Sequence, residues 1–326
     1  MKQQLIRSIK LAVLAVAQLL GLFALARRLT RGQARILCYH GFAYHDEHRF
    51  APKLFMQPQT FTRRMEQLAR SGYDVVPLAE LLRRLQHGES IDNLVVITVD
   101  DGWTGFARFA FPVLQRLRLP STLYLTTWYV EKQRPVLNVL RRYLQWRGVA
   151  LPAESTDHWQ EYQQLQHAAA QAGVALAHAG EPLFRLSTLA EVQTMAEQGL
   201  DVQLHTHRHR LPRDPAALAD ELNHNRQLIT ALTKRPADDL CFPSGEYHAE
   251  HLPLLRANAV RSATTTVLGL VTAQSDLLQL PRLLDGENWH PLEFAAELSG
   301  FMTLLRRALG RDHGAGLYPV TTRQPA

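Results

Sequence analysis

The sequence predicts an α/β protein in which parallel strands alternate with helices and close into a barrel. Two observations lead to this fold class. From residue 34 onward, short apolar runs alternate with segments of helical periodicity. In addition, polar clusters directly follow five of the apolar runs, and the C-terminal ends of barrel strands are where such folds carry their active sites. Seven strand–helix units in one large domain fit a barrel-like closure.

The expected strands and helices follow from local patterns. Phe61, Met65 and Leu68 share one helical face, and Thr188 with Glu191 forms a capping box at the start of another helix. The predicted strands cover residues 34–42, 93–102, 121–127, 201–207, 239–245, 261–267 and 277–284. The predicted helices cover 59–72, 104–119 with a break near Pro112, 188–199, 215–234 and 249–258.

One internal segment has a different composition. Residues 131–184 are rich in Gln, His and Ala, with helical pieces around 137–147 and 158–172, so we expect a helical insertion there. The predicted organisation is therefore an N-terminal helix over 1–33, a catalytic domain over 34–300 that contains the insertion, and a C-terminal tail over 301–326.

The net charge of +6 comes from the N-terminal segment. Seven of the 36 Lys and Arg residues lie within residues 1–35, which contain no acidic residue, and the remaining 29 balance the 30 Asp and Glu residues. A near-neutral body without a basic face predicts no nucleic-acid partner. The two cysteines, Cys38 and Cys241, lie inside apolar runs, which favours buried free thiols over a disulfide.

The N-terminal segment also carries an apolar run from Leu11 to Ala26 with basic flanks. Sixteen residues fall short of the ~20 that a spanning helix needs. Three interpretations stay open: a membrane-associated helix or uncleaved anchor, a signal peptide, and a helix docked on the domain. We expect a membrane-associated protein of the cell envelope, with either side of the membrane open, the cytoplasmic face included.

His205 and His209 in "LHTHRHRLP" have the i, i+4 spacing of metal ligands. This spacing alone is weak evidence, because roughly 0.7 such pairs are expected by chance among 15 histidines. Its position directly after a predicted strand gives it weight, since a second strand ends in Asp100 and Asp101.

The adjacent carboxylates Asp100 and Asp101 end the run "VVITV". A solvated Asp-Gly turn is the simplest explanation of this pair alone. Together with the two histidines, however, one carboxylate completes a three-ligand site that leaves positions open for water on a divalent ion. The other carboxylate then stays unligated beside that water and is placed to act as a base.

These motifs resemble those of the polysaccharide deacetylases of carbohydrate esterase family 4, the chitooligosaccharide deacetylase-like superfamily. "TVDDG" is similar to the family's T-F-D-D-G, "HTHRH" to H-[S/T]-x-x-H, and "CFPSGEY" to R-x-P-Y-G. "ILCYHGF" followed by "FTRRMEQLARSGYDVVPLAEL" resembles the N-terminal part of the circularly permuted bacterial subgroup. The resemblance covers roughly residues 34–300, and the first two motifs in order are a strong signal.

The resemblance implies a deformed (β/α)₇ barrel with Asp100 as catalytic base and Asp101, His205 and His209 as metal ligands. The metal is expected to be Zn²⁺, with Co²⁺ or Ni²⁺ as alternatives. Cys241 stands where the family has the arginine that orients the base, and Arg282 after another strand is the expected substitute. No late leucine-x-x-histidine motif supplies the general acid, so His40 is the expected replacement.

The remaining candidates concern the substrate. Ser244 and Gly245 form a turn that we expect to offer a backbone N–H to an oxyanion, because no G-x-S-x-G elbow makes Ser244 a nucleophile. His207, between the two predicted ligands, is expected to point away from the metal.

We therefore expect a metal-dependent hydrolase that removes N-acetyl groups from an N-acetylhexosamine-containing polysaccharide or glycolipid. The open alternatives are an O-acetyl esterase or a deformylase with the same metal site, and a non-catalytic carbohydrate-binding relative. The expected partners are this substrate and, through the N-terminal segment, a membrane surface. The sequence leaves the oligomeric state open.

Overall fold

The computed structural model describes residues 2–178 and 181–310. Its main sheet contains β1 (Arg35–Tyr39), β4 (Asp74–Val75), β5 (Leu94–Asp101), β6 (Thr122–Leu125), β9 (Asp201–Leu204), β10 (Asp239–Cys241), β11 (Ser262–Leu268) and β12 (Leu280–Leu284). Two small sheets pair β2 (Gly41–Phe42) with β3 (Phe55–Met56) and β7 (Ala177–His178) with β8 (Glu181–Pro182).

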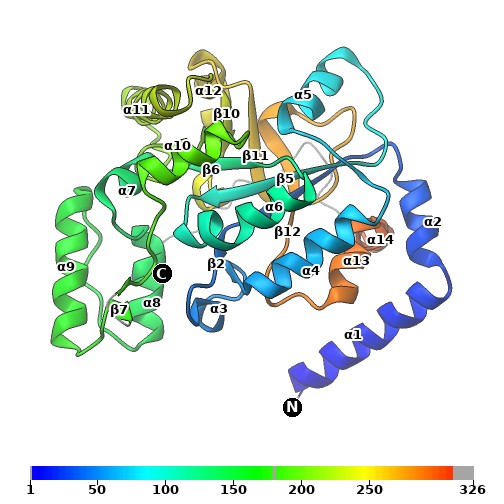
Figure 1. Cartoon of the computed structure of the whole chain (residues 1–326), viewed down its shortest axis with the longest axis horizontal. Coiled ribbons are helices and arrows are strands. Elements are labelled where there is room, and N and C mark those ends of the chain that lie inside the picture. The colour runs from blue at the N-terminus through cyan, green and yellow to red at the C-terminus, as the bar shows by residue number, and fades with distance from the viewer. Residues whose placement is uncertain (1, 179–180, 311–326) are drawn as a thin grey trace.

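The main sheet closes into a barrel. Its strand order is β1-β12-β11-β10-β9-β6-β5-β4, and β1 also pairs with β5, so that seven strands form a ring and β4 extends it beside β5. Every pairing in this sheet is parallel. The predicted deformed (β/α)₇ barrel is confirmed (Figure 1).

Helices surround the barrel. They are α1 (Lys2–Leu19), α2 (Leu22–Leu29), α3 (Glu47–Phe50), α4 (Pro58–Ala69), α5 (Leu78–His87), α6 (Phe111–Leu117), α7 (Thr127–Lys132), α8 (Leu137–Trp146), α9 (His158–Gln171), α10 (Leu189–Glu197), α11 (Pro215–Thr233), α12 (His251–Ala257), α13 (Pro291–Leu298) and α14 (Phe301–Ala308). A π-helical turn at Phe106–Ala110 precedes α6, and 3₁₀ turns lie at Pro243–Gly245 and Leu277–Gln279.

Local sequence signals explain several of these boundaries. The side-chain oxygen of Thr188 accepts from the Glu191 amide, and the Glu191 carboxylate accepts from the Thr188 amide, which confirms the capping box of α10. The break predicted near Pro112 is not present, because residues 104–117 form one continuous helical run; a π-helical turn directly precedes α6 instead. The strand predicted over 277–284 is wrong at its start, because residues 277–279 form a 3₁₀ turn that Asp276 caps.

Side-chain alternation in β5 divides the barrel into an interior and an outer layer. Val95, Ile97 and Val99 pack outward in the main hydrophobic core, while Val96 belongs to a second core cluster. Because successive side chains of a strand point to opposite faces, Asp100 lies on the same side as Val96, in the barrel interior. Asp101 ends the strand with a φ of 74° and departs from this alternation.

The N-terminal helices pack against the C-terminal ones. Leu14, Ala17 and Phe23 form a small buried cluster with Ala296 of α13, and the Phe23 and Phe301 rings lie 5.2 Å apart. Residues 301–308 of the predicted tail are thus helical, and residues 311–326 lie outside the described part.

Among the described residues, no single helix is long and apolar enough to cross a membrane. The segments Gln4–Leu19 and Leu22–Leu29 pass this test only together, as a pair bent by 76°.

A buried ion pair joins α4 to the loop after β12 and gives stability a predictable dependence on pH. Asp285 accepts from Arg64 Nε and from the Tyr39 hydroxyl, each at 3.2 Å. Burial outweighs these bonds and raises the pKa of Asp285 to about 6. Between pH 4 and pH 6 the folded chain then binds more protons than the unfolded one, so the free energy of unfolding falls as pH rises through this window.

We expect Asp285→Asn to remove this fall. Loss of the Arg64 pair lowers the free energy of unfolding of the variant by an amount that does not depend on pH. The difference in unfolding free energy between variant and wild type should nevertheless rise by up to about 3 kcal/mol in favour of the variant from pH 4 to pH 7. Urea unfolding across this range measures the difference. Asp74→Asn, at an exposed position, is the matched control, and a pH-independent difference for Asp285→Asn would contradict the expectation.

Candidate active site

A cavity of about 350 Å³ opens at the C-terminal ends of the barrel strands and collects most of the residues predicted to be functional. Its lining includes His40 after β1, Asp100 and Asp101 from β5, His205 and His209 after β9, and Ser244 and Gly245 after β10. α8 contributes Asn138, Val139 and Arg142, so the helical insertion forms part of the cavity wall. Arg282 lies beneath the cavity, completely buried in the barrel interior.

Asp101, His205 and His209 converge on one point. Asp101 Oδ1 lies 3.2 Å from His205 Nε2 and 3.3 Å from His209 Nε2, and the three ligand atoms lie within 4.8 Å of one another. A tetrahedral ion bound at about 2.0–2.2 Å separates its ligand atoms by about 3.3–3.5 Å. The spacing of these atoms therefore fits one divalent cation.

The chemistry of the donor set agrees with this spacing. Asp101 Oδ1 is a buried oxygen without a hydrogen-bond partner among the described residues. The other oxygen of the same carboxylate, Oδ2, accepts from Trp103 Nε1 at 2.8 Å. An orphaned buried carboxylate oxygen is costly unless a cation or proton compensates it. Two imidazoles and one carboxylate with open positions are the donors of a catalytic zinc site.

Neighbouring groups hold the ligands in place. The Nδ1 of His205 donates to the Cys241 carbonyl at 2.8 Å, which leaves Nε2 free to face Asp101. Asn225 of α11 accepts from the His205 amide at 2.9 Å and donates to the Leu125 carbonyl at the end of β6. Asn225 is completely buried on a helix face that also contains Leu218, Leu222 and Ile229, and its role was not predicted.

Three residues at the ligand site have left-handed backbone conformations, which residues other than glycine rarely adopt. Asp101 has a φ of 74°, Thr206 of 59° and His209 of 55°. Such residues cost on the order of 1–3 kcal/mol each and persist where the surrounding structure fixes them, which is common at functional sites.

Asp100 of β5 is held by Arg282 of β12, and the two strands flank β1 in the ring. The guanidinium donates through Nη1 to Oδ1 and through Nη2 to Oδ2, both at 2.8 Å. The same guanidinium donates to the Thr265 carbonyl and to Thr98 Oγ1, so it is fixed on several sides. β12 thus supplies the arginine that is missing at Cys241.

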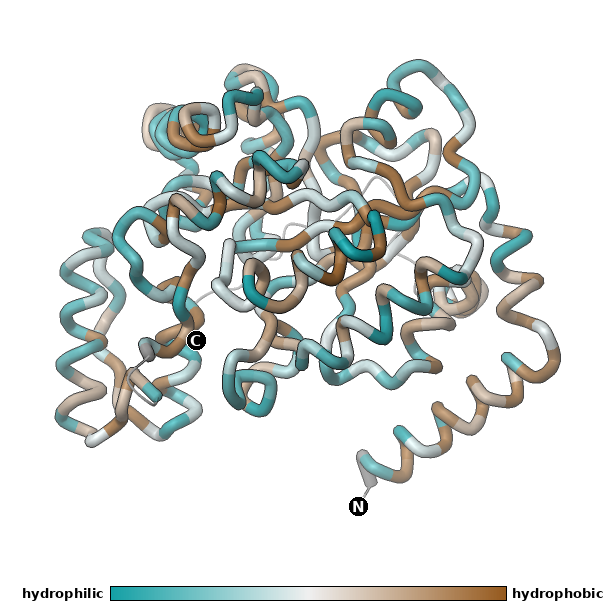
Figure 2. The backbone as a smooth tube through the Cα atoms, in the orientation of Figure 1, coloured by the Kyte–Doolittle hydropathy of each residue, from teal (hydrophilic) through white to brown (hydrophobic). Residues whose placement is uncertain are grey.

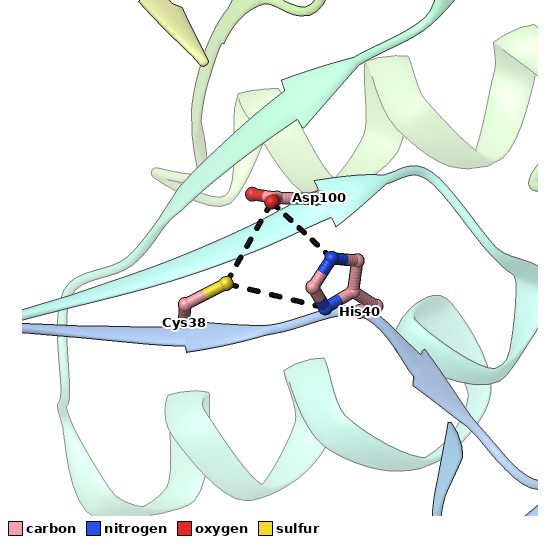
Figure 3. A group of neighbouring side chains, drawn as sticks. All are labelled: Cys38, His40 and Asp100. Carbon is pink, nitrogen blue, oxygen red and sulfur yellow. Dashed lines mark hydrogen bonds and ion pairs between the residues drawn. The ribbon is translucent and has the colours of Figure 1, made fainter. Parts of the chain in front are cut away.

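His40 and two thiols complete the surroundings of Asp100 Oδ2, and Figure 3 shows His40 and the first thiol, Cys38. The Nε2 of His40 lies 3.5 Å from this oxygen, Cys38 Sγ lies 3.7 Å away and Cys241 Sγ 3.4 Å. Both cysteines are free and buried, as predicted, but their position beside Asp100 was not foreseen. Side chains alternate between the two faces of a strand, and this alternation explains why the thiols lie beside Asp100. The side chains that point into the barrel interior are those of Cys38, Asp100, Cys241 and Arg282.

Burial and charge act in opposite directions on these groups. Burial raises the pKa of Asp100, but Arg282 and then His40 outweigh it and bring the pKa to about 2. Burial lowers the pKa of His40, although Asp100 and Asp101 oppose the shift. Asp100 is therefore an ionised carboxylate at neutral pH, and His40 is mostly neutral.

The turn at Ser244 and Gly245 is only partly as expected. The Gly245 amide donates to the Phe242 carbonyl at 2.9 Å, so it is committed to the turn, and the expected backbone N–H for an oxyanion stays a prediction. In the described chain we find no backbone acceptor for the Ser244 amide. A side chain at Gly245 would meet Thr266 at 2.1 Å, which explains the glycine.

The other histidine of the motif points away. His207 Nδ1 lies 2.9 Å from Thr127 Oγ1, and its ring stacks on His224, outside the cavity lining. The expectation that it is not a ligand agrees with this geometry.

Comparison with known proteins identifies the family. The family model described as polysaccharide deacetylase matches residues 87–263, more than half of the chain. The chain belongs to the polysaccharide deacetylase family. Asp100, Asp101, His205 and His209 all lie within the matched region, and His40 lies before it. Among curated proteins we find no match to this chain.

Solved structures of deacetylases share the fold. The deacetylase PplD of Streptococcus pyogenes, in complex with acetate, is 19% identical with a TM-score of 0.60 over 82% of this chain and 98% of that chain. IcaB from Ammonifex degensii is 17% identical with a TM-score of 0.58 over 82% and 97%. A de-N-acetylase from Aggregatibacter actinomycetemcomitans is 14% identical with a TM-score of 0.58 over 81% and 99%. The predicted circular permutation stays a prediction.

Proposed function

We propose that this family member is a metal-dependent N-deacetylase of an N-acetylhexosamine-containing polysaccharide or glycolipid. The convergence of Asp101, His205 and His209 beside Asp100 is the observation that carries the proposal. A non-catalytic relative has no need to keep both a complete ligand set and an ionised carboxylate beside it. The cavity is also large enough to admit a sugar with its acetamido group.

Asp101, His205 and His209 would hold the ion, which we expect to be Zn²⁺, with Co²⁺ or Ni²⁺ as alternatives. When bound, such an ion supplies a Lewis acid that lowers the pKa of a water and polarises the acetyl carbonyl. Trp103 and the Cys241 carbonyl orient two of its ligands through the bonds described above.

In this proposal Asp100 is the general base. Its carboxylate, ionised because Arg282 holds the pKa near 2, accepts a proton from the attacking water. His40 is the general acid for the departing amine. Burial keeps His40 mostly neutral, so it must receive a proton before it can protonate the amine. Asp100 passes on the proton that it took from the water, since its Oδ2 lies 3.5 Å from His40 Nε2. The Ser244 amide stabilises the developing oxyanion.

The test is acetate release from a chitooligosaccharide by the full chain loaded with Zn²⁺. We expect free acetate and one new primary amine for each acetate released. An O-acetylated and an N-formylated oligosaccharide serve as the matched panel, because the alternatives of an esterase and a deformylase predict the higher kcat/KM there. Release from none of the three substrates would overturn the enzymatic proposal.

Arg282 acts through Asp100, and its removal should appear as a change in pH dependence. In Arg282→Met, burial of Asp100 is no longer opposed by the guanidinium, so the pKa of the carboxyl rises. The acid limb of kcat/KM should move to higher pH, with a loss of about tenfold for each pH unit below the new pKa. Arg282→Lys should recover part of this shift. A uniform loss at all pH values would indicate a purely structural role.

A further inference from the structure

One face of the molecule concentrates its exposed apolar side chains. Of the fifteen large apolar residues that are exposed in the described chain, twelve lie on or next to α1, α2 and α14. We call this set the apolar face: Leu5, Ile6, Ile9, Val13, Val16, Leu19, Leu20, Leu22, Leu25, Leu29, Leu305 and Leu309. Leu5 is 63% exposed and Leu19 86%. The three helices are neighbours, since α2 contacts both α1 and α14, and a group of exposed apolar side chains on neighbouring helices marks an interaction surface.

The opposite side of α1 is fixed to the domain. Leu14 and Ala17 are buried against α13, Lys10 Nζ lies 2.6 Å from Glu293 Oε1, and Arg7 donates to the Asn288 carbonyl at 2.9 Å. The exposed apolar side chains of α1 therefore lie on the side away from Leu14 and Ala17. The many brown segments along α1 show how apolar this helix is (Figure 2).

α2 belongs to the folded domain. Its residue Arg27 donates to the Gly72 carbonyl. Thr30 packs closely on Gly300, because a Cβ atom at position 300 would lie 2.5 Å from Thr30 Oγ1. The buried Arg35 guanidinium, at the start of β1, donates to Thr30 Oγ1 at 2.6 Å. Signal-peptide cleavage at the end of the apolar run would leave these residues in place but remove Phe23, whose ring lies 5.2 Å from that of Phe301.

The charges around the apolar face favour an anionic lipid surface as its occupant. Residues 1–35 contain seven basic residues and no acidic one. Arg35 is buried, and four others bind groups of the protein: Arg7, Lys10, Arg27 and Arg31. Arg28 is exposed beside Leu25 and Leu29, and it has no ion-pair partner in the described chain. In-plane helices bind bilayers through buried apolar area together with basic residues that meet anionic headgroups.

We propose that α1, α2 and the end of α14 form a monotopic membrane-binding surface for an anionic bilayer. The helices lie in the plane of the headgroups, because the 76° bend between α1 and α2 and the side-on docking of α1 leave no straight segment to cross the bilayer. The proposal concerns the membrane surface and does not depend on the reaction.

The position of α1 links this surface to the cavity. Asn288, whose carbonyl accepts from Arg7, also lines the cavity, as does its neighbour Trp289. The segment after β12 therefore contacts both the bound helix and the site. If the proposed deacetylase activity holds, this arrangement favours the glycolipid among the substrate alternatives, because such a substrate is anchored in the same surface.

Vesicle co-sedimentation of the full chain tests the proposal. We expect binding to phosphatidylcholine vesicles that contain phosphatidylglycerol, and weaker binding to phosphatidylcholine alone. Replacing Leu5, Ile9, Val13, Val16 and Leu20 with Gln should weaken binding at least about tenfold, since each buried apolar side chain contributes to partitioning. Trp146→Gln with Trp159→Gln, at exposed apolar positions on α8 and α9, is the matched control and should bind like the wild type.

Labelling distinguishes an in-plane helix from a spanning one. The native Cys38 and Cys241 are buried, so a cysteine placed at Gln4 or Gln18 reports selectively. A membrane-impermeant maleimide added outside sealed vesicles should label both positions equally. Labelling of only one end, equal vesicle binding by the Gln variant, or a wild-type dimer that this variant converts to a monomer would each overturn the proposal. Acetate release from a soluble oligosaccharide is measured in parallel, and the Gln variant should retain it.

Discussion

Asp100→Asn should lower kcat for acetate release by about 10²–10⁴-fold, the range that a general base contributes. The amide has nearly the shape of the carboxylate but cannot accept the proton of the attacking water. Its neighbours Arg282 and Asp101 stay in place, so the bound metal should remain at one ion per chain. Measuring kcat and metal content on the same sample separates loss of the base from loss of the site.

Two controls make this result specific. Asp220→Asn, at an exposed position on α11, should keep the wild-type rate. Circular dichroism should show that Asp100→Asn still folds, because the variant leaves the buried Arg282 guanidinium without its carboxylate. A folded, metal-loaded Asp100→Asn with the wild-type kcat would exclude Asp100 as the base.

Loss of the metal ligands should have an effect at least as large. His205→Gln or His209→Gln removes one of three ligand atoms, and the several kcal/mol that a bound ion supplies correspond to a loss of about 10³-fold or more in rate. A chelator should produce the same loss in the wild type. Added Zn²⁺ should restore the chelated wild type but not the variants.

The same motif offers the matched control. His207 lies between the two proposed ligands and bonds to Thr127 outside the cavity, so His207→Gln should keep its metal and most of its rate. Activity that resists both the chelator and the ligand variants would contradict a metal-dependent reaction.

The sequence predicted the barrel and most of its site because both follow from local rules. The run of buried apolar residues in β5 identifies a parallel strand, and carboxylates directly after it identify the functional end of the barrel. Arg282 was predicted to replace the arginine missing at Cys241, and the structure places its guanidinium on both oxygens of Asp100.

Other features depend on contacts between distant segments and were not predicted. The helices α5, α13 and α14 were missed. The whole of α14 was assigned to the tail, because its packing on α2 has no local signal. The Gly245 amide was assigned to the oxyanion, yet the turn consumes it through a bond to Phe242. Asn225 acts on a loop 20 residues before it in the chain, which no spacing rule anticipates.

The most direct test of the central claim is a crystal structure of the zinc-loaded chain with anomalous diffraction at the zinc edge. We predict one anomalous peak at the barrel end, about 2.0–2.2 Å from Asp101 Oδ1 and from the Nε2 atoms of His205 and His209. A zinc-loaded, active protein whose anomalous peak lies away from these three atoms would contradict the account.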